Sequence, residues 1–173
     1  MMEWKDNFDY EQRTENFRQQ KTEQEYTLER AAKFLARRAY TRQGLYQKLV
    51  QDGLTPETVL EALDRMDDMG VLDDEEYGRN LIRKCIRKGY GPIRIAAELH
   101  RSGVDGEIRQ IMLQELPDEM DMLLVYLNHV CVPEDLEDEK YYQKLSRSLN
   151  RKGYHWSVIN EGMRRYQRMG NEI

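Results

Sequence analysis

Residues 72–104, LDDEEYGRNLIRKCIRKGYGPIRIAAELHRSGV, decide the fold of this 173-residue chain. Five apolar or small residues of this stretch recur at helical spacing: Gly78, Leu81, Ile82, Cys85 and Ile86. Asp73 is a typical residue for the start of this helix, and Gly89 suits a left-handed helix end. Pro92 suits the first position of a second helix, because proline is tolerated there. The stretch therefore predicts two helices joined by a short turn.

The same pattern recurs on both sides at a spacing of 50 residues. Three glycines end the second helix of each copy: Gly53, Gly103 and Gly153. Each second helix carries a pair of aliphatic residues: Leu45 and Leu49, Ile95 and Leu99, Leu145 and Leu149. Third helices follow at the same spacing, and their equivalent apolar positions include Leu63, Leu113 and Met163. Fixed-period similarity is typical of repeat proteins. We expect left-handed conformations at the three glycines.

The repeats divide the chain into four segments: a polar extension over 1–26, repeat one over 27–70, repeat two over 71–116 and repeat three over 117–173. In repeat one we expect a first helix over 26–39, a cap at Thr41, and a new helix start at Thr55-Pro56-Glu57. Repeat three departs from the pattern. We expect its first helix over 118–132, an inserted acidic loop over 133–139, and a last helix over 156–169.

Composition favours an all-α fold, because the chain has three Phe and few strand-forming residues beside 34 % charged residues. No apolar run is long enough to cross a membrane, and the N-terminus does not resemble a secretory signal. Cys85 and Cys131 lie in apolar patterns, which predicts buried reduced thiols and a cytoplasmic protein. The aromatic residues of 1–26 allow two interpretations, a tail or a partner-binding arm.

Charge is arranged in blocks along the chain. Residues 77–102 carry 7 bases and 1 acid, whereas residues 53–76 carry 1 base and 9 acids. The basic blocks predict a partner-binding surface, but solvated ion pairs within the protein would explain the same residues. The net charge of −5 argues against unspecific coating of DNA.

No catalytic or metal-binding pattern emerges. His100, His129 and His155 stand alone, without metal-ligand spacing to either cysteine. The glycines punctuate helices and do not form a phosphate-binding loop. We therefore predict a binding protein that is not an enzyme and that uses no cofactor, metal ion or small-molecule substrate.

Four motifs resemble those of the RecX regulatory proteins. Residues 70–77, Gly-Val-Leu-Asp-Asp followed by Tyr77, match one motif, and residues 88–99, KGYGPIRIAAEL, match a second. Residues 36–49 and 149–154 resemble two more, the latter as Leu149, Arg151 and Lys152-Gly153-Tyr154. Gln43-Gly44 departs from the family, which usually has an acid before the first leucine. The resemblance covers about residues 27–168.

The resemblance implies an elongated, curved array that binds in the groove of the RecA–single-stranded DNA filament and modulates RecA, in the main by inhibition. It implies a monomer that contacts DNA mainly through the filament. From the charge pattern, eight basic residues are our candidates for partner binding: Arg37, Arg38, Arg42, Arg83, Lys84, Arg87, Lys88 and Arg94. Two other functions stay open. One is a helical-repeat adaptor for another protein. The other is a helix-turn-helix repressor, which acidic third helices in two of the repeats disfavour.

Overall fold

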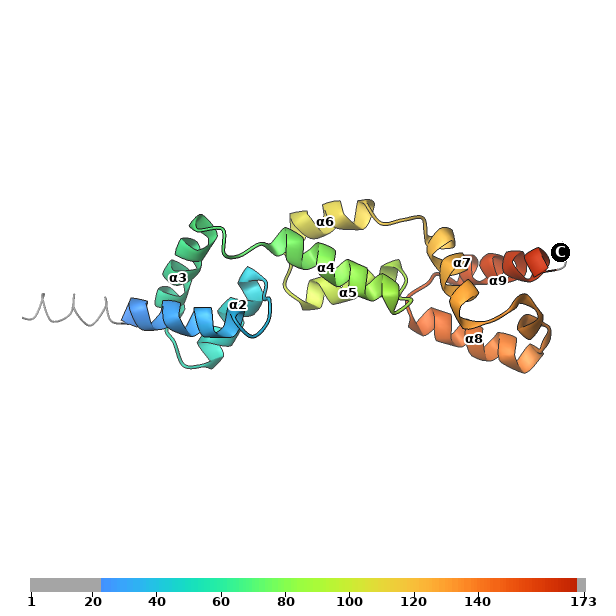
Figure 1. The fold of residues 1–173 in the computed structure, drawn as a ribbon, viewed down its shortest axis with the longest axis horizontal. Helices are drawn as coiled ribbons and strands as arrows, with labels where there is room; N and C mark the ends of the chain where they lie inside the picture. Colours follow the sequence, from blue (N-terminus) through green and yellow to red (C-terminus); the bar gives the residue numbers. More distant parts are fainter. Residues whose placement is uncertain (1–22, 171–173) are drawn as a thin grey trace, which may run out of the picture. The chain divides into compact units, whose positions relative to one another are not determined.

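The computed structural model describes residues 23–170, and every regular element within them is a helix (Figure 1). A first helix covers residues 23–35. The others follow in chain order: α2 Arg42–Gln51, α3 Pro56–Asp68, α4 Asp74–Arg87, α5 Pro92–Arg101, α6 Gly106–Gln114, α7 Glu119–Val130, the 3₁₀ helix η1 Pro133–Glu137, α8 Glu139–Arg151 and α9 Trp156–Gly170. The all-α prediction is confirmed. Most of the predicted 1–26 extension lies outside the described residues.

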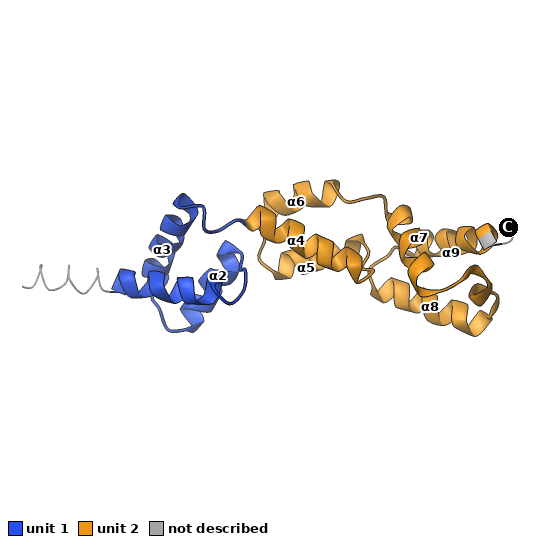
Figure 2. Cartoon of the chain, viewed as in Figure 1, with its two compact units in different colours: residues 1–73 blue, residues 74–173 orange. Residues whose placement is uncertain are grey.

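The chain forms two compact units, divided between Asp73 and Asp74 (Figure 2). The first unit contains the 23–35 helix, α2 and α3, and the second contains α4 to α9. Helices α4–α6 and helices α7–α9 of the second unit share one continuous core. The repeat boundaries at 70/71 and 116/117 remain a prediction.

The three glycines at 50-residue spacing end their helices in the same way. Gly53, Gly103 and Gly153 have φ angles of 94°, 74° and 91°, which confirms the expected left-handed conformation. In each case the N–H of the next residue donates to a carbonyl five residues back, at 3.2–3.3 Å, as in Leu54 to Leu49. The glycine N–H donates to the carbonyl three residues back at 3.0–3.1 Å. These two bonds define the Schellman motif, which satisfies carbonyls left free at a helix end.

Three of the predicted helix starts are confirmed, and one of them lacks its expected side-chain cap. The Thr41 hydroxyl accepts from the Gly44 N–H at 3.0 Å, which caps α2 as expected. Pro92 begins α5, with Gly91 at the cap position. Pro56 also begins α3, but the expected side-chain cap from Thr55 is not made. The Thr55 hydroxyl instead lies 2.7 Å from the Thr58 hydroxyl.

The core of the first unit is built from the predicted apolar stripes. Leu45 and Leu49 of α2 pack with Val59, Leu63 and Met66 of α3, and all five are buried. The expected first helix over 26–39 was wrong in its bounds, because the helix covers 23–35 and the chain then turns. The N–H groups of residues 37 and 38 both donate to the carbonyl of residue 34, which closes this turn without a glycine.

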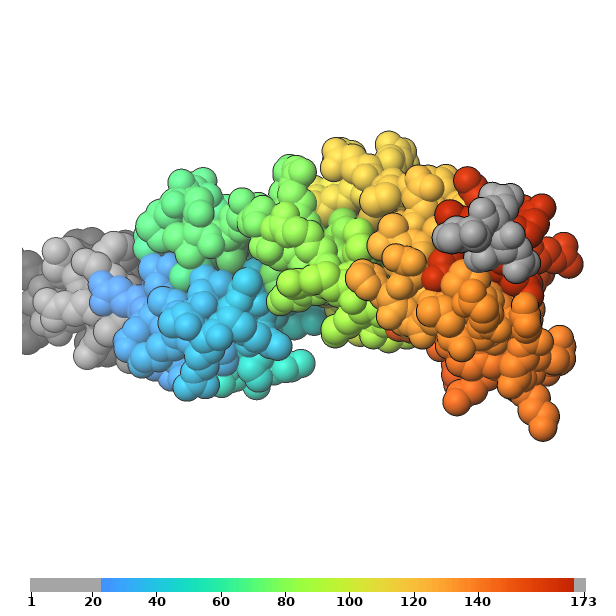
Figure 3. Space-filling view, turned by 45° about the vertical axis from the view of Figure 1, so that its right-hand side comes forward, coloured from blue at the N-terminus to red at the C-terminus, as the bar shows by residue number. Residues whose placement is uncertain are grey.

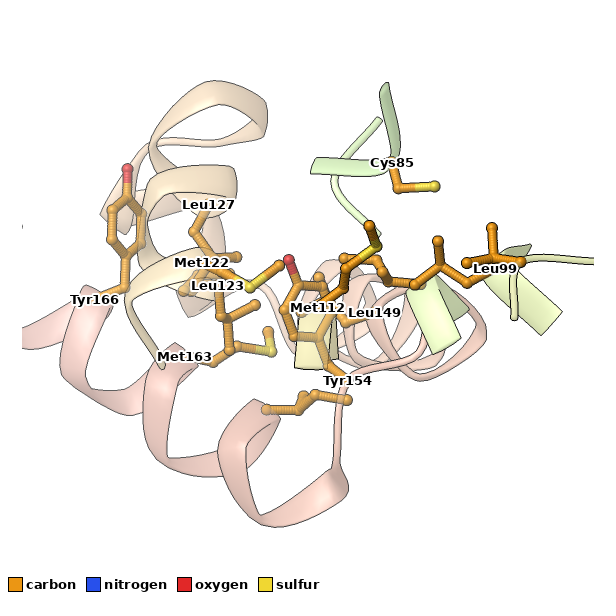
Figure 4. Close-up of a cluster of buried hydrophobic side chains, with 14 residues drawn as sticks. Cys85, Leu99, Met112, Met122, Leu123, Leu127, Leu149, Tyr154, Met163 and Tyr166 are labelled. Carbon is orange, nitrogen blue, oxygen red and sulfur yellow. The ribbon is translucent and has the colours of Figure 1, made fainter. Parts of the chain in front are cut away.

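The core of the second unit runs through all of its helices (Figure 4). Ile95, Leu99 and Leu149 are fully buried, as the repeat pattern predicted. Two predictions were wrong in detail. Ile86 is 37 % exposed, because the α4 stripe is only wide enough to bury Gly78 and Cys85. Leu145 is only partly buried, and the neighbouring Ser146 takes the interior position, where its hydroxyl donates to the Tyr142 carbonyl.

The acidic segment predicted as an inserted loop contains the 3₁₀ helix η1 and contributes to the core. Leu136 of η1 is 3 % exposed and belongs to the same core as α7 and α9. The Asp135 carboxylate accepts from the Val132 N–H at 3.0 Å, and Asp138 caps α8 by accepting from the Lys140 N–H at 2.8 Å. Acidic residues therefore shape this segment by capping helix starts. The orange residues of α7, η1 and α8 lie directly against the red residues of α9 in Figure 3.

Candidate partner-binding surface

The last turns of α4 carry three of the predicted basic residues. Arg83 donates to Glu76 at 3.0 Å and to Asn80 at 2.6 Å, so its charge is partly compensated. Lys84 and Arg87 are exposed, and within residues 23–170 neither has a carboxylate at ion-pair distance. The three side chains line a shallow groove of about 490 Å³ together with Ile86 and Asn80. Positive charge is favourable here, because the C-terminal end of a helix carries a partial negative charge.

A second group of cations surrounds the Tyr90 ring. The charged groups of Lys88, Arg94 and Lys152 lie 6.0, 5.4 and 5.3 Å from the ring centre. Lys152 is also 4.8 Å from the centre of the Tyr126 ring. Aromatic faces attract cations at these distances, and the attraction offsets part of the repulsion among three positive charges. We call these five residues the tyrosine–cation cluster.

One carboxylate balances part of the cluster. Arg94 Nε lies 2.8 Å from a Glu98 carboxylate oxygen, in an ion pair that lacks the alignment of a hydrogen bond. The other Glu98 oxygen accepts from Arg101 at 2.8 Å. Glu98 is thus shared between two arginines, and the tyrosine–cation cluster keeps a net positive charge.

The cluster exists because two turns that are distant in sequence dock on one another. The Gly91 N–H donates to the Lys152 carbonyl at 2.9 Å, and the Ile93 N–H donates to the Gly153 carbonyl at 3.2 Å. In return, Lys152 Nζ donates to the Lys88 carbonyl at 2.6 Å. Both turns contain the tripeptide Lys-Gly-Tyr, at 88–90 and at 152–154. Each therefore places a lysine and a left-handed glycine at the contact.

Glycine is required at this contact for reasons of space. A Cβ at Gly91 would lie 2.5 Å from the Gly153 carbonyl oxygen, and one at Gly153 would lie 2.4 Å from the Arg94 backbone nitrogen. A Cβ at Gly89 would overlap the Tyr126 ring. These approaches fix the second and third helical repeats against each other and hold the cations in place.

Tyr154, the last residue of the second Lys-Gly-Tyr tripeptide, is buried, with 1 % of its surface exposed. Burial raises the pKa of its phenol to about 12. Burial likewise raises the pKa of the Cys85 thiol, which keeps this free cysteine in its protonated, unreactive form. The ring nitrogen Nδ1 of His155 lies 2.8 Å from one carboxylate oxygen of Glu119, and the backbone N–H of His155 donates to the other. These groups are explained by packing and capping.

The first unit holds the other three predicted residues. Arg37 is exposed, and the Arg38 guanidinium stacks 4.4 Å from the Tyr40 ring centre. Arg42 is paired with Asp64 and Asp67 of α3. Burial opposes its charge, but the two carboxylates outweigh this effect and raise the pKa of Arg42. At Arg42 the geometry thus favours the ion-pair interpretation, whereas Arg37 and Arg38 face solvent.

Sequence reasoning missed Lys152 and Tyr126 as members of the surface. The sequence contains a feature that identifies Lys152, since the repeated Lys-Gly-Tyr tripeptide marks both turns. No comparable sequence feature identifies Tyr126, because its ring reaches the cluster only through the packing of α7 against the Gly89 turn.

Two further observations concern residues 23–170 alone. None of their helices combines the length and the apolar character that crossing a membrane requires. No three of their His, Cys, Asp or Glu side chains are grouped so that they would hold a metal ion.

Comparison with known proteins places these features in a family. Residues 28–66 match the model of the first three-helix domain of RecX, and residues 73–113 match that of the second. The regulatory protein RecX of Mycobacterium sp. (strain KMS) is 34 % identical over 134 residues, which cover 73 % of each chain. The regulatory protein RecX of Xanthomonas citri is 38 % identical over 80 residues, or 46 % of this chain and 49 % of that protein. This chain thus spans about half the length of the Xanthomonas relatives that it matches.

A solved structure agrees in fold. The crystal structure of RecX from Lactobacillus salivarius superposes with a TM-score of 0.70 at 18 % sequence identity, over 88 % of this chain and 99 % of that one. Together with the sequence matches, the tandem three-helix domains assign the chain to a family: it belongs to the RecX regulatory proteins.

Proposed function

We propose that this protein regulates the RecA recombinase, in the cytoplasm, by binding the RecA filament on single-stranded DNA and inhibiting its activity. Family membership supports a regulatory role. The observation that carries the finer proposal is the net positive surface on α4 and around Tyr90, which is held rigidly by the docked turns.

The charge pattern of this surface supports a protein–DNA filament as the partner. Lys84, Arg87 and the tyrosine–cation cluster supply positive charge, while acidic residues lie in the first turn of α4 and at the start of α6. A filament presents both signs of charge, so a partner with both kinds of block can be complementary to it. The whole chain carries 27 basic against 32 acidic residues, so its long-range field does not favour a bare polyanion.

The direct test is co-sedimentation with RecA filaments while the RecA ATPase rate is followed. We expect the wild type to sediment with the filament and to lower the rate. The triple variant Arg83→Glu, Arg87→Glu and Lys88→Glu should bind more weakly and with a smaller salt dependence. Its fold should be retained, since all three side chains are exposed.

A matched control makes the same change of charge elsewhere. Arg164, Arg165 and Arg168 are exposed residues of α9, so their replacement by Glu alters the net charge equally. We expect this control to inhibit RecA like the wild type. Equal losses in both variants would mean that only net charge matters. Absence of the wild type from the filament pellet would overturn the proposal in favour of an adaptor for another protein.

Selectivity for the filament is a second expectation of the same proposal. A repeating filament can contact several basic blocks at once, and such avidity multiplies affinity by ~10²–10⁴. Fluorescence anisotropy at physiological salt, with and without RecA and a non-hydrolysable nucleotide, measures the difference. Equally tight binding to naked single strands would contradict the filament as the principal partner.

A further inference from the structure

A basic stripe runs along the outer face of α8 in the second unit. Its members follow helical spacing over three turns: Lys140, Lys144, Arg147 and Arg151. All four side chains are exposed, whereas Leu149 and Ser146 on the opposite face of α8 are buried. The stripe therefore faces solvent.

The four cations lack the compensation seen elsewhere in the chain. Within the described residues 23–170, none of them lies within ion-pair distance of a carboxylate, in contrast to Arg42, Arg79 and Arg94. The guanidinium of Arg147 donates instead to the neutral Gln143 amide, at 3.2 Å. Four like charges side by side repel one another, and an anionic partner would relieve that repulsion.

Trp156, the first residue of α9, completes the surface. It lines the same groove as the four cations, a hollow of about 490 Å³ whose other walls are Gln143 and Asn150. Its side chain is 50 % exposed, which is unusual for the largest apolar side chain in a unit with a continuous core. Every residue that lines this groove is basic, an amide or aromatic.

We propose that this groove binds single-stranded DNA, with the phosphates along the α8 stripe and a base stacked on Trp156. Basic grooves with an exposed aromatic ring are the general solution for binding single strands without regard to sequence. Eleven residues of helix span about 16 Å. At a rise of about 3.4 Å per stacked nucleotide, this length matches about four or five phosphates.

An acidic protein segment is the competing partner, and the tryptophan argues against it. Carboxylates would satisfy the four cations, but an acidic peptide gives no reason for an exposed indole beside them. A nucleotide strand has both an anionic backbone and flat bases, so it uses every wall of the groove. The proposal goes beyond the proposed function, because it assigns the strand a direct contact that needs no RecA.

The test uses the full chain with Trp4→Phe, which leaves Trp156 as its one tryptophan. Oligothymidylate should quench the Trp156 fluorescence on binding. An abasic strand of equal length should bind through charge without quenching it, and duplex DNA should not quench it, because its bases are already stacked. Trp156→Ala should weaken oligothymidylate binding about tenfold and leave binding of the abasic strand unchanged.

The charge contacts are tested by the double variant Lys144→Glu and Arg147→Glu. It should lose about tenfold in affinity, and its plot of log affinity against log salt should become shallower by about 1.4, or 0.7 per phosphate contact. The matched control Arg164→Glu and Arg165→Glu makes the same charge change on α9 and should bind oligothymidylate like the parent.

Several results would overturn the proposal. These are an unquenched Trp156 at saturating oligothymidylate, equal losses in the control variant, polyglutamate binding as tight as that of oligothymidylate, or tighter binding of oligouridylate. Since no arm contains RecA, a positive result here stands even if the filament test fails, and a negative result leaves the filament proposal intact.

Discussion

The turn at 39–41 and the turn at 89–91 occupy the same place in two successive repeats and differ by two side chains. The first reads Ala39-Tyr40-Thr41 and the second Gly89-Tyr90-Gly91. Both tyrosines carry cations on their rings, Arg38 on Tyr40 and the lysines and Arg94 on Tyr90. The cation–tyrosine contact is thus common to both, and the glycines are what separates them.

The glycines decide whether another part of the chain can dock on the turn. At Gly89 and Gly91 the missing side chains leave room for the Tyr126 ring and the Gly153 carbonyl. Ala39 and Thr41 fill the corresponding space with a methyl group and with a hydroxyl that caps α2. The comparison agrees with the division of the chain, in which the 23–35 helix, α2 and α3 have a core of their own, whereas α4 to α9 and η1 share another.

The largest expected effect breaks the docked turns. Gly153→Ala adds a Cβ 2.4 Å from the Arg94 backbone nitrogen and strains a residue with φ of 91°, so we expect a loss of about 3 kcal/mol in the free energy of unfolding of the second unit. Gly53→Ala in the first unit meets no atom within 4 Å and should cost only about 1 kcal/mol. Urea unfolding, monitored by amide hydrogen exchange in α2 and in α5, measures the free energy of unfolding of each unit separately. Equal losses at both glycines would contradict the close approach.

An intermediate effect concerns pH. The pKa of Tyr154 is raised from 10 to about 12 in the folded protein. A raised pKa contributes stability that is present below pH 10 and is lost as pH rises towards 12, up to about 2.5 kcal/mol. The first unit has Leu54 at the corresponding position, so only the second unit should weaken through this group.

The variant Tyr154→Phe isolates this effect. It should remove the alkaline loss attributable to residue 154, which unfolding titrations at pH 9, 10, 11 and 12 would reveal as a flatter profile than that of the wild type. An unchanged alkaline slope would assign the loss to other tyrosines.

The smallest effect lies within the first unit. Thr41→Ala removes the hydroxyl that accepts from the Gly44 N–H and should cost about 1 kcal/mol, while Thr41→Ser should preserve the cap. Thr55→Ala should cost less than about 0.5 kcal/mol, because Thr55 makes no such cap. Thermal unfolding of the three variants compares them. A loss at Thr55 as large as that at Thr41 would show that its contact with Thr58 matters more than the missing cap.

The sequence predicted the features that depend on neighbours in the chain. Helix starts at Pro56 and Pro92, left-handed ends at Gly53 and Gly153, and the cap at Thr41 all rest on local backbone chemistry. The apolar period identified most of the core for the same reason. The early end of the first helix was missed because its turn closes without glycine or proline.

The surface was less predictable, because its geometry depends on distant contacts. A glycine in a sequence indicates that a side chain is missing, but it does not identify the group that fills the space. The pairing of Arg42 with Asp64 and Asp67 depends on how α2 and α3 pack, and so does the choice between a free basic face and internal ion pairs. The eight proposed binding residues remain a prediction that the filament experiment tests.

The 3₁₀ helix η1 bears on how a repeat series ends. In a stacked array each repeat is covered by the next one, so the last repeat has an apolar side without a neighbour. Here the insertion that interrupts the repeat pattern places Leu136 in the core against α9, and its exposed residues are mostly acidic. The segment thereby resembles a capping repeat, because it covers apolar surface on one side and presents charged residues to water on the other. Deletion of η1 would move Gly153 out of the 50-residue period and would uncover the apolar surface of α8 and α9 that this segment now protects.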